Sequence, residues 1–160
     1  MFVATVVPLH WLQPGYDAKN QLMSELALGR YGEAMLVAFA GLALAMLGAF
    51  FSRAARPRAI RCVLAAASLF FLLAGVFPLG ASSEMHIAAI ATAFVLSVLA
   101  MYLHPADALP RAISWSLAAG IALSVALGHS ILPMGIGQRL AAACLLLWLV
   151  LLGWSLRARR

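Results

Sequence analysis

Long runs of apolar residues, separated by short polar breaks, are the main feature of this 160-residue chain. A helix needs about 20 apolar residues to cross the roughly 30 Å hydrocarbon core of a bilayer, because lipid offers no partner for unpaired backbone groups. Five runs meet this requirement, and each predicts a membrane-spanning helix. They cover residues 33–52, 60–79, 86–103, 112–128 and 140–156. The breaks are too short to hold a soluble domain, so residues 1–160 are predicted to form one helical membrane domain.

The first thirty residues do not fit the pattern of a complete span. Residues 1–13 are apolar, but at about 1.5 Å per residue they extend only some 18 Å, so we interpret them as a partial first helix. Residues 18–28 are predicted to form a short outer amphipathic helix that ends at Gly29. Its apolar face would consist of Leu22, Met23 and Leu26. The expected fold is an all-α integral membrane protein: a bundle of five complete transmembrane helices, a partial N-terminal helix and this outer amphipathic helix.

Composition agrees with a membrane protein. Hydrophobic residues make up 65% of the chain and charged residues 10%, against roughly 45–50% and about 25% in soluble domains. The net charge of +6 would fit nucleic acid or another acidic partner, yet the basic residues occur at the predicted helix ends, in a topological pattern. We therefore expect membrane lipids as partners and no nucleic acid.

The arginines also predict an orientation. Short loops rich in Lys and Arg stay in the cytoplasm, and residues 52–61 carry four arginines. Placing this loop inside puts eight of the eleven basic residues and one of the five acidic residues on the inner side. The prediction is a multi-pass protein of the cytoplasmic (inner) membrane, with a cytoplasmic C-terminus and with residues 15–32 external.

Four separated motifs resemble one family. They are Pro14-Gly15-Tyr16-Asp17, Met23-Ser24-Glu25-Leu26, Gly75-Val76-Phe77-Pro78 followed by His86, and Gly137-Gln138-Arg139-Leu140. In order and spacing, over nearly the whole chain, they resemble the bacterial polytopic membrane proteins grouped as domain-of-unknown-function 998, which are usually predicted to have six helices. The resemblance implies a helical membrane fold and brings no settled activity with it. It also implies a full first helix, of which residues 1–13 supply about half.

Polar residues gather at the predicted outer ends of the helices. Glu25, Glu84, His86, His129 and Arg139 could converge around one outward-facing mouth. Ionisable side chains near membrane depth are costly and commonly functional, so His86, Glu25 and Arg139 are candidate catalytic residues, as base, acid or anchor. Alternatively, they lie in the headgroup region, where a charge costs little. A further structural alternative is an ion pair between Glu25 and Arg139, which would fasten the outer helix to the last span.

His86 and His129 form the sharpest pair of candidates. They begin the third predicted span and end the fourth, two antiparallel neighbours, so we expect them to face each other at similar depth. Two such imidazoles could bind a metal ion or haem. Since no third ligand has a motif-like spacing, no metal site and no cofactor is expected. His104, at the opposite membrane face, and His10, in the partial helix, are not counted with this pair.

Three functions remain compatible with the sequence. The first is a non-catalytic membrane component that packs with a partner subunit or binds lipid, favoured by the short loops and by the lack of a strong catalytic motif. The second is a membrane enzyme acting on a lipid or small substrate at the outward-facing His/Glu/Arg site. The third is a haem or metal carrier that uses His86 and His129. No Asp, Glu, Lys or Arg lies at mid-span, which argues against an ion-coupled transporter. The first function is favoured, and enzymatic activity is left open.

Overall fold

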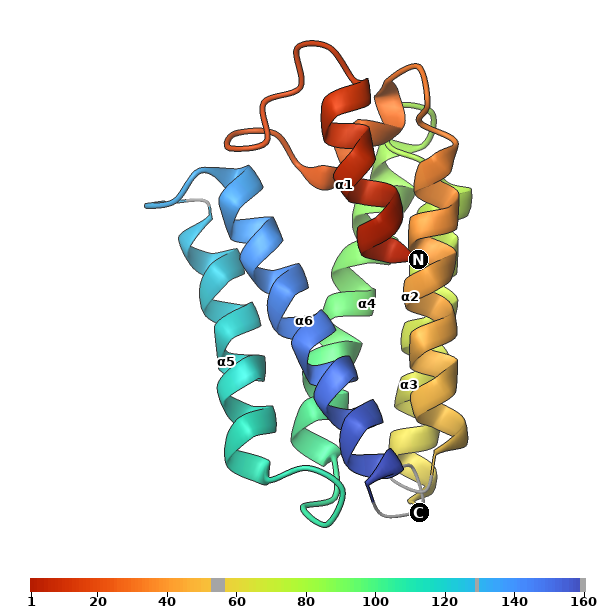
Figure 1. Cartoon of the computed structure of the whole chain (residues 1–160), viewed down its shortest axis with the longest axis vertical. Helices are drawn as coiled ribbons and strands as arrows, with labels where there is room; N and C mark the ends of the chain where they lie inside the picture. Colours follow the sequence, from red (N-terminus) through yellow and green to blue (C-terminus); the bar gives the residue numbers. More distant parts are fainter. Residues whose placement is uncertain (53–56, 129, 159–160) are drawn as a thin grey trace.

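The fold is all-helical, as predicted. The computed structural model describes residues 1–52, 57–128 and 130–158, and these residues form helices and connections without a strand. Figure 1 shows the long helices side by side along the long axis of the molecule, with the chain reversing direction at each end. The elements are α1 (Phe2–Leu12), the 3-10 helix η1 (Met23–Leu28), α2 (Ala34–Phe51), α3 (Arg58–Val76), α4 (Ser83–Leu103), α5 (Arg111–Leu127) and α6 (Met134–Arg157).

Four of the described helices are long and apolar enough to cross a membrane. These are α2, α3, α4 and α6, which have 18, 19, 21 and 24 residues. The chain is therefore a multi-pass membrane protein. The fourth predicted span, residues 112–128, corresponds to α5, an apolar helix of 17 residues, which is close to the shortest length of about 17 residues that crosses a bilayer. Helix α1, with 11 residues, is shorter than a span.

The start of α6 differs most from the sequence prediction. The helix begins at Met134, after Pro133, and not at Leu140. Proline suits the start of a helix because its fixed φ is already helical and it has no N–H to leave unpaired. Gly135 and Gly137 lie inside α6, where they allow close packing. A Cβ atom at Gly135 would clash with the carbonyl oxygens of residues 18, 19 and 21.

The helices pack in two groups. Helix α3 packs against both α2 and α4, α5 pairs with α6, and α1 packs on α2 (Figure 1). Polar groups in the core bond across helices: the hydroxyl of Ser68 donates to the carbonyl of Ala43 at 2.9 Å, and the indole of Trp148 donates to the hydroxyl of Ser114 at 3.2 Å. Such bonds contribute about 0.6 kcal/mol each in membrane proteins. They fix the rotation of α3 against α2 and of α6 against α5.

The connection from α1 to α2, residues 13–33, is called the cap below. The predicted amphipathic surface helix over residues 18–28 is wrong in extent and kind, because only Met23–Leu28 is helical and as a 3-10 helix. Its Met23, Ser24 and Leu26 side chains are buried in the bundle. Ahead of η1, the carboxylate of Asp17 accepts hydrogen bonds from the backbone N–H of Lys19 at 2.9 Å and from Asn20 at 2.6 Å. This local turn competes with a helix. As predicted, the helical segment ends before Gly29.

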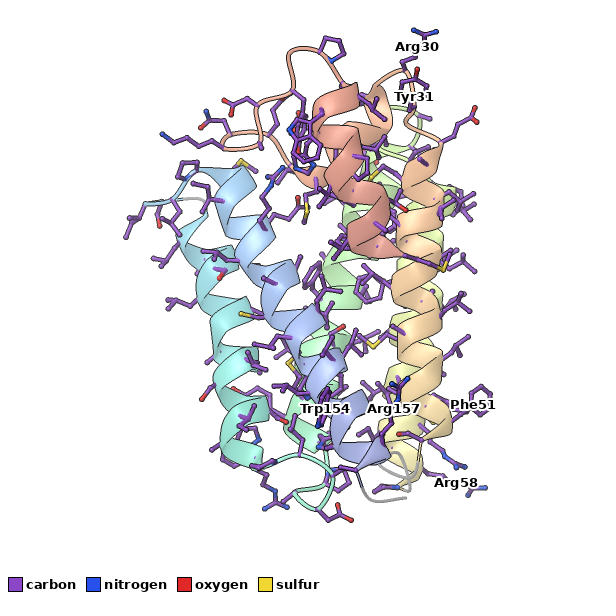
Figure 2. The ribbon with its side chains drawn as sticks, in the orientation of Figure 1. Arg30, Tyr31, Phe51, Arg58, Trp154 and Arg157 are labelled. Atoms are coloured by element: carbon purple, nitrogen blue, oxygen red, sulfur yellow. The ribbon has the colours of Figure 1, made fainter. Side chains whose placement is uncertain are left out.

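The two ends of the bundle differ in composition. The cap end carries the cap and the start of α6. The opposite end, called the basic end, carries the exposed Arg58, Arg61, Arg111 and Arg157. Figure 2 places Arg30 and Tyr31 at the cap end, and Phe51, Arg58, Trp154 and Arg157 at the basic end.

Candidate functional site

Arg139, on α6, is the centre of the polar contacts at the cap end. Its Nη1 donates to the carbonyl oxygens of Gly135 at 2.8 Å and of Gln21 at 3.1 Å. Its Nη2 donates to the hydroxyl of Tyr16 at 2.6 Å and to Nε2 of His10 at 2.9 Å. These five residues are called the Arg139 cluster. Four hydrogen bonds from one side chain join α6 to α1 and to the cap.

His10 enters the cluster in one defined tautomer. Its Nδ1 lies 2.6 Å from the carbonyl oxygen of Val6, so this nitrogen carries the hydrogen and donates it. Nε2 is then a bare acceptor, which is what the guanidinium of Arg139 requires. The ring also packs edge-on against Tyr16, with centroids 5.2 Å apart. His10 is not among the residues predicted for the site, because a lone histidine in a short apolar helix gives no sign of a partner 129 positions away in the chain.

Tyr16 is the link between Arg139 and the cap. Its hydroxyl donates to the carbonyl oxygen of Leu22 at 2.9 Å while it accepts from Arg139. Burial raises the pKa of Tyr16, and the hydrogen bond from Arg139 offsets this only in part. The phenol therefore stays protonated at neutral pH and continues to donate. The guanidinium also lies 5.7 Å from the centroid of the Tyr16 ring, within cation–π range.

Glu25 has a different partner from the one predicted. Its Oε1 accepts from the backbone N–H of Leu22 at 2.8 Å, and its Oε2 accepts from the side-chain amide of Gln21 at 3.1 Å. The carboxylate thus caps the start of η1, where a helix leaves N–H groups unpaired. The proposed ion pair with Arg139 is not formed, since the hydrogen bonds of Arg139 all go to neutral acceptors. Glu25 and Arg139 instead meet through Gln21, which contacts both.

His86 lies apart from these contacts, inside the bundle. Its side chain is 1% exposed, and its Nδ1 lies 2.8 Å from the carbonyl oxygen of Ala74 and 3.1 Å from that of Phe77. These are carbonyls at the end of α3, which the helix itself leaves unpaired. Nδ1 therefore carries the hydrogen, and Nε2 is buried without a partner among the described residues. The ring packs edge-on against Phe39 at 5.6 Å. His86 thus fastens α4 to α3.

The remaining candidates that the structure describes do not join one site. His129 is outside the described residues, so its predicted pairing with His86 stays a prediction. Glu84 is exposed in the first turn of α4. His104 follows α4 at the basic end, 2% exposed and edge-on to Trp148 at 5.8 Å. Burial lowers the pKa of His104, and Asp107 opposes this only in part. In the part of the chain that the structure describes, no three His, Cys, Asp or Glu residues are grouped to hold a metal ion.

A small cavity of about 20 Å³ lies between η1 and the bundle. Its walls come from α1, α2, η1, α4 and α6, and most of them are apolar. The polar exceptions are Ser24 and Gln138, and the Gln138 side-chain oxygen also accepts from the backbone N–H of Met23 at 2.5 Å. A buried water needs roughly 10–15 Å³ of such space. The cavity therefore has room for about one water molecule.

At the basic end, the arginines have no such contacts. Arg58, Arg111 and Arg157 are exposed and form no hydrogen bond or ion pair with another described residue. Arg61 is exposed as well, and its guanidinium lies 5.7 Å over the ring of Phe50. Asp107, at the same end, is also exposed. These charges are available to groups outside the chain.

Comparison with known proteins gives one family and no function. A family model described as "Protein of unknown function (DUF998)" matches residues 1–155. This range includes the cap, the Arg139 cluster and His86. No curated protein and no solved structure matches the chain.

Proposed function

Because the chain belongs to the DUF998 family of proteins of unknown function, we propose a role from its own geometry: a non-catalytic membrane component that binds lipid or packs with a partner subunit. The observation that carries this proposal is that the hydrogen bonds of Arg139 go to groups of its own chain. A guanidinium has five N–H donors, and four hydrogen bonds of Arg139 end within its own chain. An arginine that anchors a substrate needs donors directed at the substrate.

The other candidate catalytic groups support the same role. The carboxylate of Glu25 accepts from a backbone N–H and from Gln21, and the Nδ1 of His86 is bonded to carbonyls of α3. A general acid and base must lie within hydrogen-bond reach of one reacting group. The hydrogen bonds of Glu25 lie within residues 21–25, those of His86 join α4 to α3, and those of Arg139 join α6 to α1 and to the cap. Each set stabilises a different part of the fold.

The proposed role includes an orientation in the cytoplasmic membrane. Eight of the eleven basic residues belong to the basic end by sequence, against one acidic residue, Asp107. The positive-inside rule then favours a cytoplasmic basic end and an external cap. In this arrangement α5 crosses as a fifth complete span, which supports a multi-pass bundle with its C-terminus inside.

A haem or metal carrier is the second candidate, and one observation favours it. The bare, buried Nε2 of His86, with Nδ1–H held by backbone carbonyls, is the arrangement that orients a metal-binding imidazole. Purified protein with a Soret band that is lost in His86→Ala would favour this candidate over the first.

The test is the composition of the protein purified gently from its native membrane. Intact mass spectrometry of the full chain reports bound lipid, cofactor and partner chains together. The proposal expects lipid or a partner subunit in stoichiometric amount. A lipid conversion by the purified protein that disappears in a Glu25→Gln variant of unchanged thermal stability would contradict it, because it would give Glu25 a chemical role.

A further inference from the structure

We infer that the basic end binds the phosphate headgroups of anionic phospholipids in the leaflet that it faces. The inference rests on the proposed function, and it names the lipid chemistry and the surface. It combines three features of that end: arginines without partners, exposed aromatic rings beside them, and an arginine held over a ring.

The arginines are a concentrated and uncompensated charge. Arg58 and Arg111 are the first residues of α3 and α5, Arg61 lies in the first turn of α3, and Arg157 is the last residue of α6. None of the four forms an ion pair with a described residue. The single acidic residue there by sequence is Asp107. Arginine binds phosphate through paired N–H donors and is weakly hydrated, so it favours phosphate at an interface. A positive surface of this kind attracts anionic membranes.

Exposed aromatic side chains mark the depth of the surface. Phe51, at the end of α2, is 76% exposed, and Trp154, near the end of α6, is 75% exposed. Figure 2 shows both at the same end as Arg58 and Arg157. Tryptophan is enriched where the hydrocarbon meets the headgroups. The arginines at the same end as these rings are therefore near the level of the lipid phosphates.

One arginine is held in place by the rings. The guanidinium of Arg61 lies 5.7 Å from the centroid of Phe50, and Phe50 packs edge-on against Phe51 at 4.7 Å. Cation–π contact leaves the N–H groups of a guanidinium available to acceptors in its plane. Arg61 is thus oriented by α2 while its donors form no hydrogen bond with a described residue, as a headgroup site requires.

The test is competition between two lipids for the full chain in mild detergent. Phosphatidylglycerol and phosphatidylcholine are added in equal amounts, and native mass spectrometry gives the ratio of the two bound forms. Each arginine near an anionic surface contributes about fivefold in affinity. The wild type should prefer phosphatidylglycerol by roughly tenfold or more, and the Arg58→Gln/Arg157→Gln variant should lower this preference by about fivefold or more, since two of the arginines are lost.

Two matched variants and one competitor complete the design. Arg58→Lys/Arg157→Lys keeps the charge and should keep most of the preference, whereas Arg30→Gln, at the cap end, should leave it unchanged. Equal binding of both lipids by the wild type, or an unchanged preference in the double Gln variant, overturns the inference. Displacement of phosphatidylglycerol by millimolar glycerol phosphate overturns it too, because it indicates a soluble-phosphate site. Retention of lipid without headgroup preference leaves the proposed function standing, whereas retention of neither lipid nor a partner chain rejects that function.

Discussion

At the cap end, Arg139 donates its hydrogen bonds to groups of its own chain: two backbone carbonyls, a phenol and an imidazole. At the basic end, Arg58, Arg111 and Arg157 donate to no other described residue. The same side chain thus serves two purposes in one bundle. A half-buried guanidinium organises the chain around itself because an unmet donor away from water is costly. The exposed guanidiniums at the basic end make no such contacts within the described chain and are available to groups outside it.

The acceptors of Arg139 explain how a charge is kept there without a carboxylate. Removing both members of an ion pair from water costs several kcal/mol per ion, and their mutual attraction does not always offset this cost. Carbonyl and imidazole acceptors bind the guanidinium without a second desolvated charge. Glu25 stays close enough to act on the pKa of Tyr16, but it satisfies the start of η1 instead of pairing. The cap is therefore held by hydrogen bonds from one cation.

The largest expected difference between the two ends is the loss of unfolding free energy when Arg139 is replaced. Arg139→Gln loses contacts with both the cap and α1, and bonds to a charged group contribute about 1.5–3 kcal/mol each, so we expect a loss of about 2–4 kcal/mol in unfolding free energy. Arg157→Gln is the matched control at the basic end and should change it by less than about 0.5 kcal/mol. Thermal unfolding in detergent measures both. Equal midpoints for the two variants would show that Arg139 is another surface arginine.

The next largest effect concerns His86. His86→Leu introduces an apolar side chain of similar size and leaves the carbonyls of Ala74 and Phe77 without this donor, which should cost about 1–2 kcal/mol. Met85→Leu, one residue earlier and 53% exposed, is the control. A His86→Leu variant as stable as the control would show that His86 does not stabilise the fold, and would favour a ligand at its Nε2.

A smaller effect is the energetic coupling between Arg139 and its neighbours, which shows the residues that act with it. A double-mutant cycle of Tyr16→Phe with Arg139→Gln should give a coupling of about 1 kcal/mol or more, because the hydroxyl and the guanidinium are bonded directly. The cycle of Glu25→Gln with Arg139→Gln should give less, since Gln21 stands between them. A larger coupling of Arg139 with Glu25 than with Tyr16 would indicate that Glu25 and Arg139 form the ion pair that the sequence suggested.

The smallest expected effect is the response of the cap to alkaline pH. The pKa of Tyr16 is raised above its ordinary value of 10.0, so the protonated phenol is favoured in the folded protein. Its contribution to stability is fully present below pH 10 and is lost as pH rises through the higher folded pKa. Tyr16→Phe should remove this part of the alkaline decline in unfolding midpoint. A decline of the same steepness in wild type and variant would assign it to other groups.

The sequence predicts the spans well because membrane helices follow from local composition alone. An apolar run of about 20 residues must be helical in lipid whatever it packs against, and α2, α3 and α4 begin and end within a few residues of the predicted limits. The start of α6 could not be found this way. A glycine such as Gly135 is typical of a loop. In the structure, the cap backbone, more than a hundred residues earlier in the chain, leaves no room for a Cβ atom at this position.

The candidate site was only partly predictable, for the same reason. Arg139 and Glu25 were found as polar residues in outer motifs, yet their partners depend on three-dimensional contacts. His10 accepts from a residue 129 positions away, and a lone histidine in a short apolar helix gives no sign of this. The η1 segment was misjudged because the side chain of Asp17 bonds to its own neighbours, and its spacing of apolar residues fits a surface helix equally well.

The most direct test of the difference between the two ends is the unfolding midpoint of two variants in two kinds of nanodisc. One nanodisc contains phosphatidylcholine alone and the other contains phosphatidylglycerol as well. Arg139→Gln should lower the midpoint by the same amount in both, because its lost partners are within the chain. Arg58→Gln/Arg157→Gln should leave the midpoint unchanged in phosphatidylcholine and lower it in the anionic membrane. An effect of Arg139→Gln that depends on the lipid, together with a lipid-independent effect of the double variant, would contradict the account.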